Sequence, residues 1–481
     1  MNLPASVPTG LSVASFRAGL ARGVEAARPA LRLWLGQSAP GEYHSPFPVR
    51  LRAARAAVVV LALLWLAAGF AGLNATRTIV RTVGHDTAPS VSAAEAIRTG
   101  IAAADADYAL AMLSNEGADG AFLSAMRLRL RAVRAAIVEA AGNVTYGEEE
   151  RGPIGTLLQG LGDYEQLVGR SVASAGDARR DLAFAADDLL HWTVLPAAAV
   201  LEKVNADHLA EDYGAYLSRQ VVAWAAVAAA LLILALVAVQ VDVARTAKRL
   251  LNPGLLAATM AVLAATALLM LRLAAAQSDL RVAKLDAFDS IYALSATGAI
   301  AAEFDAAESF GLLAADDPAR KSRYTTDNGL RARRLLGLPP DAAVDVLRND
   351  YKTYGDVGYL GDELANVTFP GERAAAERLV KAWAGILQKD AALAAASTRG
   401  DRAAAMAIKA SNLPDGARQA FARFDAALAD VLAINRSAFA DRIASAEGDD
   451  APLGAVLVVG FVLAVGAAWF GIGRRLDEYR F

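Results

Sequence analysis

Two aspartates offer the clearest chemistry in this sequence. Asp105 and Asp305 each lie in the middle of an alanine-rich stretch, AAADADYA and AAEFDAAES, where a helix is expected. A carboxylate between helices could face a ligand, and Arg98 and Tyr108 lie close to the helical face of Asp105. Together these residues could form a pocket for a small zwitterion or anion. These four residues are therefore candidate ligand-binding residues. The alternative is a structural carboxylate that faces solvent or a hydrogen-bond donor, because an unpaired charge is costly to bury.

Residues suited to catalysis or metal binding are sparse. The chain has four histidines and no cysteine, and it lacks the His-Glu-x-x-His, Walker A and Gly-x-Ser-x-Gly motifs. We therefore expect no enzymatic activity, no bound metal and no cofactor. The net charge of −3 also argues against nucleic-acid binding.

Four apolar runs frame the segments that carry the aspartates. Each approaches the roughly 20 apolar residues that a helix needs to cross a bilayer; they are residues 56–73, 221–241, 255–272 and 452–472. The short basic loop between the second and third runs, residues 242–254, is expected on the cytoplasmic side. The sequence thus predicts a multi-pass protein of the inner (plasma) membrane. Its basic N-terminal segment 1–55 and its tail 473–481 are expected in the cytoplasm.

The two long segments between these runs, residues 76–217 and 277–450, are expected to be helical and extracytoplasmic. The first segment carries 12 basic and 20 acidic residues, and the second carries 21 basic and 26 acidic residues. Residues 1–55, by contrast, carry seven basic and two acidic residues. In the first segment we expect helices at Thr76–Ser114, Ala121–Ala141 and Pro153–Ala175. A fourth starts at Gly176 and continues past Leu217 into the membrane. Long helices with short connections predict an antiparallel four-helix bundle.

The two halves of the chain repeat one another. At an offset of 200 residues, Asp86, Ser90 and Asp105 correspond to Asp286, Ser290 and Asp305. The run NVTY at 143–146 corresponds to NVTF at 366–369. These runs also match the glycosylation sequon, but their equivalent positions favour a structural loop. The predicted fold class is an all-α integral membrane protein with four transmembrane helices and two tandem-duplicated extracytoplasmic four-helix bundles.

Each half is similar to the four-helix-bundle sensor domains of bacterial chemoreceptors and histidine kinases. More specifically, the runs TAKRLLNPGLLAA (246–258), AKLDAFDSIYALS (283–295), AEFDAAES (302–309) and RLDEYR (475–480) resemble an actinobacterial-type, GlnX-like family of four-helix membrane proteins. The resemblance covers roughly residues 55–481 and has no counterpart for residues 1–50. It implies signal relay from an external solute-binding protein, with glutamate or aspartate as its solute, to a cytoplasmic Ser/Thr kinase.

The predicted function is therefore that of a membrane sensor or signal-relay protein. Its expected partners are the membrane, an extracytoplasmic solute-binding protein, a cytoplasmic kinase or other effector, and a second copy of the chain. Two alternatives remain open: a non-sensing envelope scaffold, and an accessory subunit of a membrane complex or transporter. The near absence of polar residues in the apolar runs disfavours a transport pathway.

Overall fold

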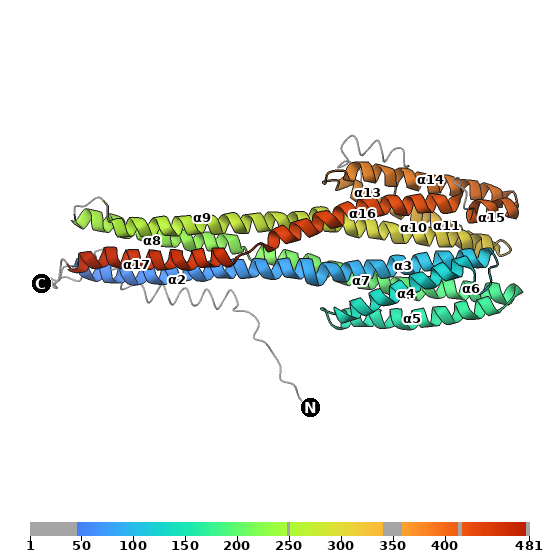
Figure 1. Cartoon of the computed structure of the whole chain (residues 1–481), viewed down its shortest axis with the longest axis horizontal. Helices are drawn as coiled ribbons and strands as arrows, with labels where there is room; N and C mark the ends of the chain where they lie inside the picture. Colours follow the sequence, from blue (N-terminus) through green and yellow to red (C-terminus); the bar gives the residue numbers. More distant parts are fainter. Residues whose placement is uncertain (1–45, 248–250, 340–357, 412–415, 478–481) are drawn as a thin grey trace, which may run out of the picture. The chain divides into compact units, whose positions relative to one another are not determined.

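The computed structural model describes residues 46–247, 251–339, 358–411 and 416–477 (Figure 1). Residues 1–45 of the predicted basic segment, 248–250 of the predicted loop and 478–481 of the predicted tail lie outside the described residues. The described residues are mostly helical and contain no strand, as predicted. They form two compact units. Among the described residues, the apolar unit comprises those within 1–75, 220–274 and 449–481, and the bundle unit comprises those within 76–219 and 275–448.

The apolar unit contains the four predicted membrane segments. They lie in α2 (Pro46–Arg81), α8 (Val221–Ala247), α9 (Pro253–Arg281) and α17 (Ala451–Asp477). All four helices are long and apolar enough to cross a membrane, which is the composition of a multi-pass membrane protein. Their inner faces pack together through side chains such as Trp65 and Leu457. The Trp65 indole donates a hydrogen bond to Thr266 Oγ1 at 3.0 Å, which satisfies its buried N–H.

Polar contacts fix both ends of α9 against α17. At its start, the Asn252 side-chain amide donates to the Gly471 carbonyl at 2.9 Å, and Asn252 Oδ1 accepts from the Gly254 N–H at 3.0 Å. Towards the other end, Arg272 forms an ion pair with the buried Asp450 at 2.9 Å. The Asn-Pro-Gly turn therefore does more than end a helix, since its asparagine also binds a distant backbone carbonyl.

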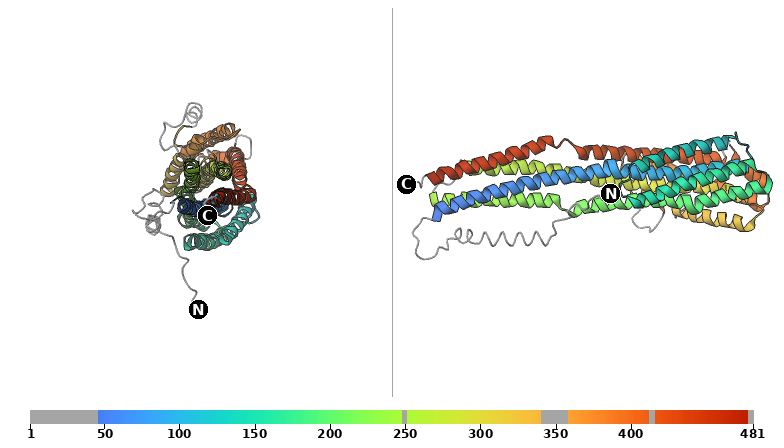
Figure 2. Two further views of the ribbon diagram at one scale, coloured as in Figure 1. Left: turned by 90° about the vertical axis from the view of Figure 1, so that its left-hand side faces the viewer. Right: turned by 90° about the horizontal axis from the view of Figure 1, so that it is seen from below.

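The bundle unit consists of helices that run lengthwise beside one another (Figures 1 and 2). Its first half contains α3 (Ala88–Leu113), α4 (Ala121–Gly142), α5 (Glu148–Ala173), α6 (Gly176–Leu189) and α7 (Leu195–Ser218). Its second half contains α10 (Asp289–Leu313), α11 (Pro318–Leu335), α13 (Tyr359–Ala365), α14 (Glu372–Thr398), α15 (Arg402–Ala410) and α16 (Ala417–Glu447). Helices α3 and α10, one from each half, pack directly against each other and are almost entirely buried.

Helix boundaries differ from the predicted ones where local backbone chemistry intervenes. Helix α5 begins at Glu148 rather than Pro153, because Gly147 turns the chain at φ +68° and three successive glutamates favour a helix N-terminus. The fourth helix continues only one residue past Leu217, because α7 ends at Ser218 and Gln220 adopts φ +47° before α8. Pro196, in the first turn of α7, comes just after a π-helical turn, Leu190–Val194.

Two further π-helical turns lie at equivalent places in the two halves, at Thr82–Thr87 and Val282–Phe288. The Asn143 side chain donates to Asp86 O at 2.9 Å and to Ser90 Oγ at 2.8 Å. The corresponding Asn366 donates to Asp286 O at 2.9 Å and to Ser290 Oγ at 3.0 Å. Both amides are thus used inside the fold, as expected for a structural loop.

One carboxylate then closes each of these loops. Glu150 Oε2 accepts from the backbone N–H groups of Thr145 and Tyr146 at 2.7 and 2.6 Å. Glu372 Oε2 accepts from the backbone N–H groups of Thr368 and Phe369 at 2.6 and 2.8 Å. Each glutamate lies in the first turn of the following helix, where its charge also interacts favourably with the helix dipole.

Candidate functional site

Asp105 lies on α3 inside the bundle unit and is only 4% exposed. Tyr164 of α5 donates a hydrogen bond to Asp105 Oδ1 at 3.2 Å. Burial raises the pKa of Asp105 well above its ordinary value, and the neighbouring carboxylate of Asp187 raises it further. Burial raises the pKa of Asp187 as well, although Tyr324 donates a hydrogen bond to it. The two aspartates are therefore neighbouring buried carboxyl groups whose ionisation is disfavoured.

A small cavity of about 20 Å³ adjoins this pair. Its lining combines acidic and basic side chains from both halves of the chain, among them Asp105, Asp187, His191, Glu303, Arg323 and Arg331. A cavity of this size holds about one water molecule. In this conformation it has no room for an amino acid, so the surrounding helices would have to separate before a ligand of that size could enter.

Arg98 and Tyr108 are not direct partners of Asp105. The Arg98 guanidinium lies between two glutamates, Glu202 at 3.1 Å and Glu303 at 3.7 Å. It therefore links α3 to α7 in its own half and to α10 in the other half. The Tyr108 hydroxyl forms a short hydrogen bond with Ser171 Oγ, and its ring packs edge-on against Tyr164 at 5.9 Å. Both residues support the surroundings of Asp105, and ligand binding by these residues stays a prediction.

Asp305 has different surroundings from Asp105, although it occupies the equivalent position. Its carboxylate accepts from Lys409 Nζ at 2.5 Å, and its backbone carbonyl accepts from the same amine at 3.0 Å. Lys409 is 1% exposed and also pairs with Glu308. Burial raises the pKa of Glu308 to about 8 despite this lysine. Asp305 thus belongs to an ion-pair triad around a buried lysine, whereas Asp105 has another carboxyl group as its neighbour.

Sequence reasoning did not identify Lys409, Asp187 or Glu303 as parts of these clusters. Lys409 lies on α15, a nine-residue helix whose N-cap, Asp401, accepts from the Ala404 N–H at 2.9 Å. A lysine on the apolar side of a short amphipathic helix was the available signal. Asp187 and Glu303 had no such signal, because their partners lie on other helices.

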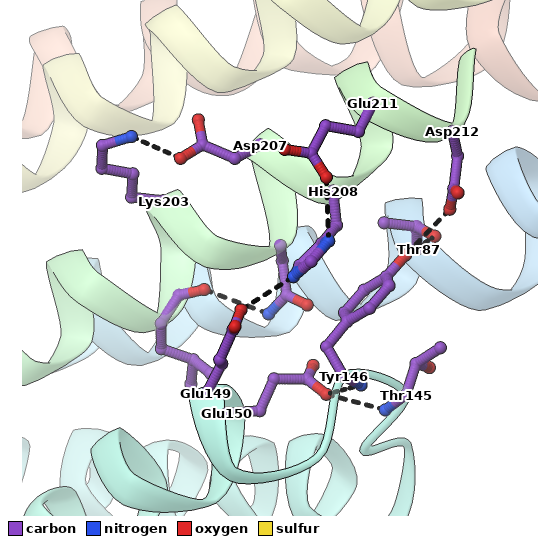
Figure 3. Close-up of polar contacts among 12 residues, drawn as sticks. Thr87, Thr145, Tyr146, Glu149, Glu150, Lys203, Asp207, His208, Glu211 and Asp212 are labelled. Atoms are coloured by element: carbon purple, nitrogen blue, oxygen red, sulfur yellow. Dashed lines mark hydrogen bonds and ion pairs between the residues drawn. The ribbon is translucent and has the colours of Figure 1, made fainter. Parts of the chain in front are cut away.

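A second polar cluster lies where the 143–147 loop contacts α7 (Figure 3). The His208 ring stacks on Tyr146, with centroids 3.8 Å apart and planes 10° from parallel. His208 Nε2 lies 2.9 Å from Glu149, and Nδ1 lies 3.5 Å from Glu211. The Tyr146 hydroxyl donates to Asp212 at 3.2 Å and is 3.0 Å from the hydroxyl of Thr87. The loop is thereby attached to both the first and the last helix of this half.

Comparison with known proteins connects the first half with sensing. Residues 79–214 match the family described as the actinobacterial sensor domain. This match runs from the end of α2 to near the end of α7, and so includes the Asp105 pair and the cluster around His208. The comparisons with curated proteins and with solved structures give no match. The first half of the bundle unit is thus similar to a bacterial sensor domain, which supports a sensing role for this chain.

Proposed function

We propose that this chain is a multi-pass membrane sensor whose bundle unit detects an extracytoplasmic signal and relays it to a cytoplasmic effector. The observation that carries the proposal is the match of residues 79–214 to a sensor-domain family. In this chain the matched segment begins at the end of α2 and ends shortly before α8. Both of these helices are long and apolar enough to cross a membrane. A bundle held in this way can convert a shift of its helices into a displacement at the opposite membrane face.

The proposed orientation places both halves of the bundle unit outside and the loop 242–254 inside. The charge distribution supports it, since residues 76–217 and 277–450 are acidic and the short segments are basic. The absence of cysteine makes this testable by single-cysteine labelling. With a membrane-impermeant maleimide, we expect Ser174→Cys to react in intact cells and Thr246→Cys to react only after permeabilisation. The reverse pattern would refute the orientation.

We also propose that the two halves arose by tandem duplication. The matching loops, in which Asn143 and Asn366 make the same hydrogen bonds and Glu150 and Glu372 close the turns alike, support this. In such an arrangement α3 and α10 form the contact between two related bundles. Arg98 bridges that contact, so a ligand-induced shift in the first half would reach the second through it.

The proposed partners are a solute-binding protein outside and a Ser/Thr kinase or other effector inside, as in the GlnX-like family that the sequence resembles. A second copy of the chain is a further proposed partner. The test is crosslinked affinity purification of the full chain from native membranes, with deletions of 76–217 and of 277–450 as controls. Recovery of a solute-binding protein that needs these segments, together with a kinase that does not, would support the relay. Recovery of cell-wall or transport machinery alone, unaffected by either deletion, would instead support a scaffold or accessory subunit.

A further inference from the structure

A groove of about 730 Å³ runs between α4 and α5 in the first half of the bundle unit. It is distinct from the Asp105 cavity, to which α4 contributes no residue. Three arginines of α4, Arg127, Arg131 and Arg134, line one side of it. Their spacing of four and then three residues places them on one face of the helix. The groove volume falls within the usual range of small-molecule sites, roughly 300–1,000 Å³.

The arginines are only partly neutralised. Arg134 pairs with Glu165 of α5, and Arg127 donates to the Ala118 carbonyl at 2.9 Å. Within the part of the chain that the structure describes, Arg131 has no ion-pair partner. Glu165 is the single acidic residue among the groove-lining residues. The groove is therefore a positively charged site in a segment, 76–217, that has eight more acidic than basic residues (20 − 12).

Apart from Ser124, the remaining side chains that line the groove are apolar. Met126, Val168 and Val172 supply hydrocarbon surface beside the guanidinium groups. Gly169 of α5 also lines the groove, and a Cβ added there would meet no atom within 4 Å. The missing side chain at this position keeps the groove open towards α5. An apolar floor beside a few fixed charges is the usual makeup of a small-molecule site.

We infer that the α4–α5 groove binds an organic acid: a carboxylate carried by an apolar body. The planar guanidinium of arginine forms paired hydrogen bonds with a carboxylate, and Arg127 and Arg131 retain donors for this purpose. The apolar body would lie on Met126 and Val172. The inference rests on the proposed sensing function, for which it names the ligand class. An occupant in contact with both α4 and α5 would fix the spacing of two helices that otherwise touch little.

The test uses the full chain in lipid nanodiscs with naphthaleneacetate as the probe. The neutral naphthaleneacetamide has the same ring system without the charge. Binding is followed by saturation-transfer difference NMR and by calorimetric titration. We expect saturable binding of the acid and at least about tenfold weaker binding of the amide, because the charged hydrogen bonds are lost. We expect a similar loss for the double variant Arg127→Gln/Arg131→Gln.

Matched variants separate the groove from general effects of charge and folding. Gly169→Trp should fill the groove and abolish binding, whereas Gly155→Trp should not, since that glycine is on the same helix, equally open, and outside the groove lining. Both changes replace a helix-interior glycine, so neither should weaken α5. Arg129→Gln removes a charge from α4 outside the groove, where Arg129 pairs with Asp107 at 2.8 Å, and should leave binding unchanged.

Three results would overturn the inference: no saturable binding of naphthaleneacetate, equal binding of the amide, or binding that survives both Gly169→Trp and the double arginine substitution. None of them would bear on the proposed sensor function, which the orientation and partner-capture experiments test without using the groove. Conversely, probe binding with the expected variant pattern would stand even if no effector were recovered.

Discussion

The buried carboxyl of Glu95 allows a quantitative test of how α3 and α10 are held together. Glu95 is 3% exposed, and its Oε2 accepts a hydrogen bond from Ser295 of α10 at 2.8 Å. Burial raises the pKa of Glu95 from 4.5 to about 8, and the nearby charge of Glu202 adds to the increase. Glu95 is therefore protonated in the folded protein at neutral pH and ionised in the unfolded chain.

The sign of the pH effect follows from this difference. Because the folded pKa lies above the unfolded one, the contribution of Glu95 to stability is complete below pH 4.5 and is lost as the pH rises towards 8. Between these values the loss is about 1.4 kcal/mol per pH unit. At pH 7, which is 2.5 units above the ordinary value of 4.5, the accumulated loss is about 3 kcal/mol. Glu95→Gln, which cannot ionise, should therefore stabilise the bundle unit by up to about 3 kcal/mol at pH 7.

The assay is urea unfolding of the full chain in lipid nanodiscs, followed by circular dichroism and tryptophan fluorescence from pH 5 to pH 8. We expect Glu95→Gln to reduce the pH dependence of the unfolding free energy by about 1.4 kcal/mol per unit. Glu139→Gln, at an exposed position on α4, should change nothing. A Glu95→Gln variant with the pH dependence of the natural chain, or one equally destabilised at every pH, would refute the reasoning.

Two further substitutions test the two units separately. Lys409→Met leaves the carboxylates of Asp305 and Glu308 without their buried cation and should destabilise the bundle unit by about 3–5 kcal/mol. Adding Asp305→Asn and Glu308→Gln should recover most of that loss in the same urea assay, and an unchanged loss would contradict the ion-pair account. Gly254→Val would place a Cβ 2.5 Å from the Ala467 carbonyl and should weaken the apolar unit by about 1–3 kcal/mol in an SDS unfolding titration. Gly466→Val, at a glycine with open space around it, is its control, and equal effects of the two would refute the close packing of α9 on α17.

Local signals in the sequence were sufficient for the helical class, for the four apolar helices and for the loops at Asn143 and Asn366. Each depends on residues close together in the chain or on a pattern repeated in it. The apolar runs have the length that a bilayer requires. The repeated Asp, Ser and Asn residues make the same hydrogen bonds in both halves, so their correspondence reflects shared local geometry.

The contacts of the candidate site were harder to predict because its residues interact with residues that are distant in the sequence. Nothing near Asp105 in the sequence indicates that it faces Asp187, and nothing near Asp305 indicates Lys409, 104 residues later. Arg98 was expected beside Asp105 but pairs with two glutamates instead. The π-helical turns were also missed, because a change of one residue in the hydrogen-bond register leaves the helical pattern of the sequence unchanged.

The contact between Glu95 and Ser295 bears directly on the proposed duplication. These residues are 200 positions apart, the same offset that relates the two halves. When two copies pack about a two-fold axis, residues close to that axis contact their own counterparts. The proposed duplication therefore places this hydrogen bond near an internal two-fold axis, with α3 and α10 on either side.

Arg98 shows how the two halves differ around such an axis. The positions that the 200-residue offset relates to Arg98 and Glu303 are Gly298 and Ala103, which carry no charge. Other ion pairs also join the halves, such as those of Asp188 with Arg320 and Arg323, so the Arg98–Glu303 pair is one bridge among several. A symmetric pair of bundles would respond equally to a ligand in either half. In this chain the Arg98–Glu303 bridge has no two-fold-related copy, so the contact between the halves is not symmetric. Arg98→Ala should weaken the contact between α3 and α10 without removing either bundle, since the ion pairs of Asp188 with Arg320 and Arg323 remain.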